Sequence, residues 1–462
     1  MSWQKTSFNR YQRPLGENER LIKFIGDRAH PAGREQWSVS ATAIFKPSDN
    51  RLATEWAATT LRDAWKLMRF QHPSIATAPT VGSENLEYAV PSEKDLESWG
   101  DETFIVAGED TCAEDVIARI KPSPFMTLYF VPHCWEVLLH TSHWRTDGYG
   151  AFQLVNAFFD AVKAVIDNDG LPELSWGEEV ARLVPSVESA LNLSETATPE
   201  TIVSARKYAS TQLYMKDSVG ISYSGDMTTR PGGTRTARMQ LSKETTEALQ
   251  RASDERNIDL FSAVHAALAI VNFENADAAF AAKTNDEMQY ASTIRLSLRP
   301  HLISPHTNNP SVAAGVYTGG YIIKVAGKDS FDEIARQYQH EYKHGASPEF
   351  LQSRRQFAAM AVEGLQKGLP LPNPPPSNID ISFVTDTDAM VTSVYETRSG
   401  PLEVLRVGLG VETLTRQPLL FLWIFRGQLD LSLVYNEAYQ DEEMASKILK
   451  DVVVALKNSL LK

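Results

Sequence analysis

The first half of the chain alternates between segments with strand periodicity and segments with helix periodicity. In residues 37–45, apolar side chains stand at every second position, which predicts a strand with one apolar face. In residues 50–70, apolar side chains recur at steps of three and four, which predicts a helix that ends before His72 and Pro73. The predicted elements of this half are strands over 37–45, 127–130 and 135–140, and helices over 50–70 and 151–166.

The segment 194–233 separates the two halves. It is rich in Ser, Thr, Gly and Arg and contains a strong turn signal at 230–233. Alternation resumes after it, with strands predicted over 236–241, 290–298, 316–325, 379–384, 402–409, 419–425 and 428–435, and helices over 242–255, 260–273 and 441–461. Strands and helices that alternate in both halves predict an α/β fold with two layers of similar size. We expect an N-terminal lobe over 1–200, a linker over 201–235 and a C-terminal lobe over 236–462.

Composition and charge narrow the class of protein. The chain has 462 residues, of which 43% are hydrophobic, so it can bury one large core or two ordinary ones. A formal net charge of −13 argues against a nucleic-acid binder, which must neutralise phosphates. The longest apolar run, residues 418–425, is far shorter than the roughly 20 residues of a membrane span. We therefore expect no nucleic acid and no membrane among its partners.

Cysteine usage and the first residues bear on the compartment. Only Cys112 and Cys134 are present, which excludes a disulfide framework and a four-thiolate zinc site. The first 21 residues contain no apolar stretch typical of a secretory signal. These observations predict a cytoplasmic protein.

One short motif carries candidate chemistry. His143, Asp147 and Gly148 follow an apolar strand and precede a helix, in the pattern His-x-x-x-Asp-Gly. A histidine can accept a proton from an alcohol at neutral pH when its ring is held in place. An acidic residue four positions on is better suited to holding the loop, and a glycine after it permits an unusual backbone turn. From the local sequence alone, the favoured alternative is an ordinary strand-end histidine with Asp147 as a helix N-cap.

The motif and its surroundings resemble a known superfamily. His-x-x-x-Asp-Gly is the signature of the CoA-dependent acyltransferases related to chloramphenicol acetyltransferase, plant BAHD acyltransferases and peptide-synthetase condensation domains. Weaker matches occur in the expected order along the chain, at residues 13–20, 61–73, 298–300 and 428–437. Within the superfamily, the chain is most similar to fungal trichothecene 15-O-acetyltransferases. The resemblance implies two similar chloramphenicol-acetyltransferase-like lobes, with mixed sheets flanked by helices and an active-site channel between the lobes.

The resemblance also implies roles for individual residues. His143 would be the general base that deprotonates an acceptor hydroxyl. Asp147 would hold the loop by pairing with an arginine, for which Arg299 is the first choice and Arg295 the second. Ser382 would donate a hydrogen bond to the oxyanion.

The implied reaction takes an acyl group, expected to be acetyl, from acyl-CoA to a hydroxyl of a fungal secondary metabolite, with a terpenoid as one candidate. Because alcohol and thioester meet at one histidine, no acyl-enzyme and no permanently bound cofactor are expected. We expect a monomer whose only partners are these two small molecules.

Two departures from the superfamily refine this expectation. The plant motif Asp-Phe-Gly-Trp-Gly is absent. Its absence weakens the assignment to the plant BAHD enzymes more than it weakens the expected acyl transfer. Ser142 replaces the first histidine of the condensation-domain pair, and no carrier-protein attachment site is evident. A free CoA thioester is therefore favoured over a tethered donor.

Two alternative functions stay open. His340, Glu341 and His344 match the zinc-hydrolase motif His-Glu-x-x-His. A solvated helix end is the favoured interpretation, because residues 330–343 are strongly polar and Gly345 follows at once. The second alternative is a catalytically silent binding protein of the same fold, against which the intact His143 motif argues.

A metal site made of His133, Cys134, His140 and His143 is a further alternative. Strand alternation would place His140 and His143 on opposite faces if the strand continues, so we give this site little weight.

Overall fold

The structure is a computed structural model that describes residues 2–47, 54–82, 84–226, 228–280, 283–368 and 375–462. Contacts within the chain group it into two compact units, each discontinuous in sequence. Unit 1 comprises the residues up to Leu193 together with Arg299–Tyr317 and Thr387–Glu412. Unit 2 comprises Ser194–Leu298, Thr318–Asp386 and Thr413–Lys462.

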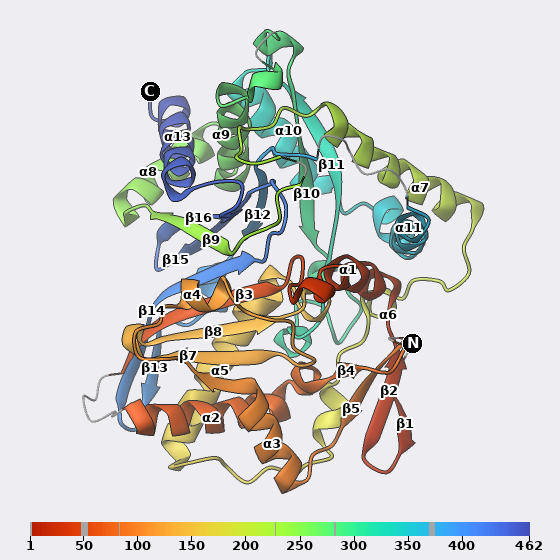
Figure 1. Cartoon of the computed structure of the whole chain (residues 1–462), viewed down its shortest axis with the longest axis vertical. Helices are drawn as coiled ribbons and strands as arrows, with labels where there is room; N and C mark the ends of the chain where they lie inside the picture. Colours follow the sequence, from red (N-terminus) through yellow and green to blue (C-terminus); the bar gives the residue numbers. More distant parts are fainter. Residues whose placement is uncertain (1, 48–53, 83, 227, 281–282, 369–374) are drawn as a thin grey trace. The chain divides into compact units, whose positions relative to one another are not determined.

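A six-stranded mixed sheet forms the centre of unit 1 (Figure 1). Its strands, in spatial order, are β13 (Val394–Thr397), β14 (Gly400–Val411), β3 (Val39–Pro47), β8 (Glu136–Thr141), β7 (Thr127–Val131) and β6 (Phe104–Val106). Neighbours are antiparallel except β6 and β7, which are parallel. Strand β14 lies far along the chain, yet it pairs with β3 from Leu402–Pro47 to Val411–Val39.

Two long helices cover the apolar face of this sheet. They are α2 (Thr54–Gln71) and α5 (Gly148–Asn168), which contact each other, and α5 also contacts β3. The predicted helix over 50–70 is confirmed from Thr54 onward, and residues 50–53 lie outside the described part of the chain. Phe45 and Phe159 pack edge to face at 5.5 Å between ring centroids, so strand and helix share an aromatic core.

Unit 1 also contains a small antiparallel sheet that lies outside the predicted elements. Its spatial order is β1 (Gln4–Ser7), β2 (Arg10–Pro14), β5 (Asn85–Ala89) and β4 (Ala78–Pro79). Strands β1 and β2 are largely polar and show little hydrophobic alternation, and β4 and β5 are only two and five residues long. The shorter helices of unit 1 are α1 (Glu17–Asp27), α3 (Glu93–Thr103), α4 (Ala113–Ile117), α6 (Val187–Ala190) and α12 (Thr387–Met390).

Unit 2 contains two sheets. The larger has the order β12 (Asp380–Val384), β15 (Leu419–Phe425), β16 (Gln428–Asn436) and β9 (Thr234–Gln240), with β12 and β15 parallel. The smaller is an antiparallel pair, β10 (Gln289–Ser297) with β11 (Thr318–Ala326).

The helices of unit 2 are α7 (Pro199–Ser210), α8 (Lys243–Glu255), α9 (Leu260–Glu274), α10 (Phe331–His344), α11 (Pro348–Gln366) and α13 (Glu442–Leu460). The range 201–235, predicted as a linker, contains most of α7 and a 3-10 segment over Thr211–Asp217. Sheets and helices in both units confirm the predicted α/β class. No helix of the described residues is long and apolar enough to cross a membrane.

Candidate active site

His143 stands at the point where the buried strand β8 gives way to a helix. All six residues of β8 are buried, Ser142 follows in an extended conformation, and His143 begins a single 3-10 turn that ends at Arg145. His143 is half-buried, whereas Ser142 and Trp144 on either side of it are buried. The strand end therefore presents one imidazole from an otherwise buried segment.

Asp147 fixes this turn to the helix that follows. Its carboxylate accepts a hydrogen bond from the Gly150 backbone N–H at 3.0 Å, which caps α5, and another from the Tyr317 N–H at 2.7 Å. Nη1 of Arg299 donates to both carboxylate oxygens at 2.6 Å. The two roles considered from sequence, N-cap and arginine partner, are thus filled by one side chain. Because it accepts four hydrogen bonds from three donor atoms, this carboxylate holds structure rather than taking a substrate proton.

The structure assigns different partners to the two candidate arginines. Arg299 is 2% exposed and bonds to Asp147 and, through Nη2, to the Gly315 carbonyl at 3.1 Å. Arg295 pairs instead with Asp380 at 2.8 Å in unit 2. Asp147 and Arg299 belong to unit 1, so this pair closes a contact within one compact unit.

The glycine that the packing requires is two residues beyond the motif. Gly148 is the first residue of α5 and has helical backbone rather than the unusual turn expected for it. At Gly150, an added Cβ would lie 2.2 Å from the Ala313 carbonyl oxygen and 2.7 Å from Nη2 of Arg299. Because such distances are far below van der Waals contact, only glycine fits there.

The structure places a buried carboxylate, that of Glu35, beside the turn, and the sequence analysis did not predict it. Glu35 is 2% exposed and accepts a hydrogen bond from the Ser142 hydroxyl at 3.1 Å. Burial raises the pKa of Glu35, while the Ser142 donor and the charges of His30 and Arg145 oppose that rise. Glu35 precedes the first predicted strand and has no periodic or motif context, so nothing in the sequence distinguishes it.

Arg145 anchors the other end of the 3-10 turn. It is 2% exposed, and its Nη2 donates to the carbonyl of Thr77 at 3.0 Å and to the carbonyl of Pro124. Its guanidinium lies over the Trp144 ring, 4.0 Å from the centroid. Burial lowers the pKa of Arg145 to about 9. Trp144 and Arg145, the two residues after His143, are therefore both held in place.

Ser382 lies in unit 2, on β12, and is half-buried. The start of this strand is fixed by Asp380, which accepts hydrogen bonds from Thr293 N–H at 3.0 Å, from Thr293 Oγ1 at 2.9 Å and from Arg295. Ser382 is thus two residues from a firm attachment of β12 to β10.

The zinc-hydrolase motif forms the exposed end of α10. His340 and His344 are exposed, with ring centroids 4.9 Å apart, and the Glu341 carboxylate accepts a hydrogen bond from the Tyr321 hydroxyl. Among the described residues, the one set of three side chains close enough to share a metal ion is Asp27, His30 and Glu35, which does not include this motif. The arrangement fits the solvated helix end favoured from sequence.

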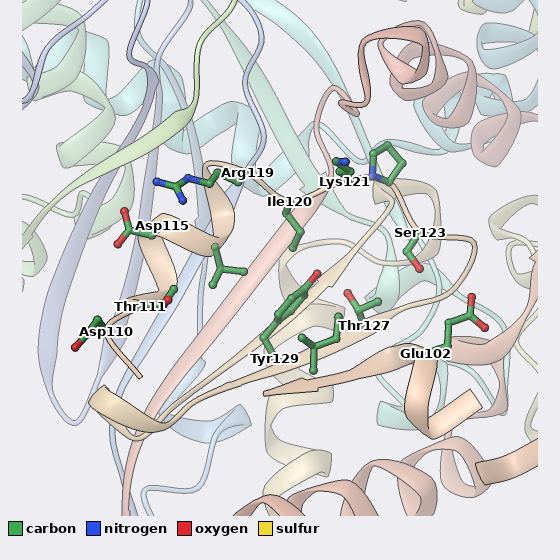
Figure 2. A pocket seen from close by; sticks show the side chains of 13 residues that line it. Glu102, Asp110, Thr111, Asp115, Arg119, Ile120, Lys121, Ser123, Thr127 and Tyr129 are labelled. Carbon is green, nitrogen blue, oxygen red and sulfur yellow. The ribbon is translucent and has the colours of Figure 1, made fainter. Parts of the chain in front are cut away.

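A cavity of about 650 Å³ lies beside β7 in unit 1. Thr127 and Tyr129 project from that strand next to Ile120, and Asp115 and Arg119 stand across from them (Figure 2). Most of the side chains that line this cavity are polar or charged, with Ile105, Val116 and Ile120 among the apolar ones.

Comparison with known proteins identifies the family. The family model described as 15-O-acetyltransferase Tri3 matches residues 109–308, a range that contains His143, Asp147 and Arg299. Acetyltransferase pigO of Monascus ruber is 45% identical over 461 residues, which cover 100% of this chain and 98% of pigO. The chain belongs to the Tri3 acetyltransferase family.

Other relatives of the Tri3 family extend the comparison. O-acetyltransferase pigM of Monascus ruber is 30% identical over 100% of this chain and 87% of its own. The azaphilone biosynthesis cluster protein M of Aspergillus terreus is 28% identical over 70% of this chain.

Solved structures share the fold. The trichothecene 15-O-acetyltransferase TRI3 of Fusarium sporotrichioides superposes with a TM-score of 0.81 at 18% identity, covering 98% of this chain and 97% of TRI3. The first condensation domain of the calcium-dependent antibiotic synthetase superposes with a TM-score of 0.64 at 12% identity, covering 96% of both chains. The resemblance stated from sequence is confirmed, and this Tri3-family acetyltransferase has the expected α/β class with mixed sheets and helices in both units.

Proposed function

We propose that the protein transfers an acetyl group from acetyl-CoA to a hydroxyl of a fungal secondary metabolite, with His143 as the general base. The single observation that carries this proposal is the half-buried His143 on a turn fixed at both sides. Its neighbours Ser142, Arg145 and Asp147 are all hydrogen-bonded to other parts of unit 1. A base held in one orientation is what general-base catalysis needs.

The proposed reaction is a single transfer. The acceptor oxygen attacks the thioester carbonyl while its proton passes to His143, so a C–O bond forms. The tetrahedral oxyanion then collapses and the C–S bond breaks. The proton on His143 goes to the leaving CoA thiolate, which restores the neutral base. Ser382 is kept as the proposed oxyanion donor, because the resemblance implies it.

The proposed acceptor class follows from the relatives' names. One relative is an azaphilone biosynthesis cluster protein, and two others are acetyltransferases of Monascus ruber. We therefore place hydroxylated azaphilones ahead of the terpenoid considered from sequence. Both classes belong in the first substrate panel.

The test is an assay of purified protein with acetyl-CoA and this panel. Free thiol release and the mass of the acetylated product report the transfer. His143→Ala is expected to lower turnover by about 10²- to 10⁴-fold with an unchanged melting temperature, because the imidazole is only half-buried. Intact-mass analysis after incubation with acetyl-CoA alone is expected to find no acetylated protein.

The controls separate this proposal from the zinc hydrolase. A variant with both His340→Ala and His344→Ala should retain transfer, and a strong chelator should have no effect. Loss of activity with the chelator or in this variant, with His143→Ala still active, would contradict the proposal. A competent acetyl adduct on the protein would replace direct transfer by a covalent mechanism.

A further inference from the structure

The residue just before the candidate base makes an unusual hydrogen bond. Ser142 is the N-cap of the 3-10 turn His143–Arg145, yet its side chain accepts no backbone N–H of that turn. N-cap side chains ordinarily do so, and Asn309, which begins another 3-10 turn of three residues, accepts from the Ser311 N–H at 2.9 Å. The Ser142 hydroxyl instead donates to the Glu35 carboxylate at 3.1 Å. The capping position of the turn is therefore tied to a different segment of unit 1.

The backbone ladder of the sheet stops short of Ser142. The pairing of β8 with β7 ends at His140, and its pairing with β3 ends at Thr141. Beyond that point the Ser142 carbonyl accepts the Arg145 N–H at 3.0 Å, which is a bond within the turn itself. Among the hydrogen bonds of the described residues, the one to Glu35 is what joins Ser142 to another segment.

Glu35 is itself firmly held. Its side chain is buried, and its backbone N–H donates to Oε2 of Glu412 at 2.8 Å. Glu412 follows β14, is also buried, and accepts the Trp37 N–H at its backbone carbonyl at 2.8 Å. An added Cβ at Gly26 in helix α1 would lie 3.1 Å from Cγ and Oε1 of Glu35, so the helix backbone lies close against this side chain. The same helix contacts the 3-10 turn. Glu35 is thus enclosed between α1, the end of β14 and the turn.

We propose that Glu35 is a positioning residue for the acyl transfer, which holds the turn that carries His143 through its hydrogen bond with Ser142. This inference rests on the proposed function. A general base must keep its nitrogen within hydrogen-bond reach of the acceptor hydroxyl, and a misplacement of about 1 Å can cost about 100-fold in rate. Arg145 and Asp147 anchor the turn beyond the base. Glu35 supplies the anchor before it.

This role requires a hydrogen-bond acceptor rather than a charge. A carboxyl group keeps an acceptor oxygen when it is protonated, and a glutamine amide also offers one. A leucine side chain of similar size offers none. Glu35→Gln should therefore preserve the contact with Ser142, whereas Glu35→Leu should remove it with little change in volume.

The test is the kcat and KM of these variants, measured with acetyl-CoA and an accepted hydroxyl substrate well below the melting temperature. Glu35→Leu and Ser142→Ala should each lower kcat about 10- to 100-fold with KM for both substrates unchanged, because the base is displaced. Glu35→Gln should keep kcat close to that of the wild type. The double variant with Glu35→Leu and Ser142→Ala should be no slower than the slower single variant, since both changes remove the same contact.

Tyr88→Phe is the matched control. The Tyr88 hydroxyl donates to the Glu179 carboxylate at 2.9 Å, both residues are buried, and Tyr88 lies on β5 in the small sheet of unit 1. Like Ser142→Ala, this change removes one hydroxyl that donates to a buried glutamate. It should lower the melting temperature by a similar amount and leave kcat unchanged. An equal fall of kcat in this control would overturn the inference, because the effect would then follow general stability.

Other outcomes decide the inference as well. Wild-type kcat in Glu35→Leu or in Ser142→Ala would overturn it. Equal losses in Glu35→Gln and Glu35→Leu would also overturn it, because they would assign the effect to the charge, and so would additive losses in the double variant. If Glu35→Leu does not fold, Ser142→Ala measured against Tyr88→Phe decides alone. A wild-type protein without transfer, or full transfer by His143→Ala, would instead contradict the proposed function.

Discussion

Two buried aspartate–arginine pairs use neighbouring arginines for different purposes. Asp147 and Arg299 in unit 1 are 4% and 2% exposed, and the aspartate also caps α5. Asp380 in unit 2 is equally buried, but the side chain of its partner Arg295 is 30% exposed. Arg295 lies on β10 and Arg299 in a short turn after it. The two arginines are only four positions apart in the chain, yet they belong to different units.

The difference lies in what each carboxylate holds. Asp147 joins the start of α5 to Arg299 and to the Tyr317 backbone, and so fixes the turn that carries His143. Asp380 joins β12 to β10, strands that belong to separate sheets. The first pair is enclosed and positions a candidate base. The second pair is partly open to solvent. It links β10 and β12 through side chains, because these two strands do not pair in one sheet.

The largest expected effect is removal of the enclosed carboxylate. Asp147→Ala leaves the Arg299 guanidinium buried without a counter-charge, which typically costs about 3 to 5 kcal/mol. We expect a loss of that size in the free energy of unfolding, measured in urea, together with loss of transfer. Asp147→Ala with full stability but no turnover would mean that the carboxylate acts in the chemistry itself.

A second test concerns the space around the enclosed pair. Gly150→Ala places a methyl group against the Ala313 carbonyl and the Arg299 guanidinium, so we expect a loss of about 2 to 3 kcal/mol from overpacking. Gly100→Ala, within helix α3, is the control. The atoms nearest to its added methyl group are the flexible side-chain ends of Arg62 and Lys66, at 3.4 Å. That control should be neutral or stabilising by up to about 1 kcal/mol. Equal unfolding midpoints for both variants would contradict this prediction, since they would show that the Ala313 carbonyl and the Arg299 side chain move to make room for the methyl group.

The sequence predicts this region well where the signal is local. Periodicity predicts β8 and α5 with the His143 motif between them, because strand and helix patterns are properties of short segments. The pairing of β14 with β3 joins residues more than 350 positions apart, so no local pattern carries it. The sequence predicts that Asp147 pairs with an arginine of the segment 295–299. Which arginine it is depends on where β10 ends, because Arg295 lies on the strand and Arg299 follows it.

Other parts of the site could not be found from sequence for a different reason. Glu35 is an isolated polar residue whose importance depends on burial, and burial is a property of the folded chain. Gly150 resembles any glycine near a helix start until the Ala313 carbonyl is placed beside it. Strands β1 and β2 lack hydrophobic alternation, and β4 and β5, with two and five residues, are too short for a reliable pattern.

The partly open pair should respond to pH. Arg295 and the donors around Asp380 lower its pKa, although burial by itself would raise it. A depressed native pKa adds stability above the unfolded pKa of about 4, and that stability is lost as pH falls through the native value. Asp380→Asn should therefore cost about 1 to 2 kcal/mol at pH 7 and progressively less below pH 4. A pH-independent difference in unfolding free energy would contradict this assignment.

The smallest effect is expected at Glu35, whose pKa shifts in the opposite direction. Burial raises the pKa of Glu35, so its contribution to stability is complete below the unfolded pKa of about 4.3 and is lost as pH rises through the native value. Glu35→Gln does not titrate and can still accept the Ser142 hydrogen bond. We expect this variant to match the wild type in acid and to exceed it near neutral pH by less than about 1 kcal/mol, since Ser142 and Arg145 offset part of the burial cost. Thermal melts of both proteins across this pH range measure the difference, and a variant that is less stable at neutral pH would show that the ionised carboxylate stabilises the turn.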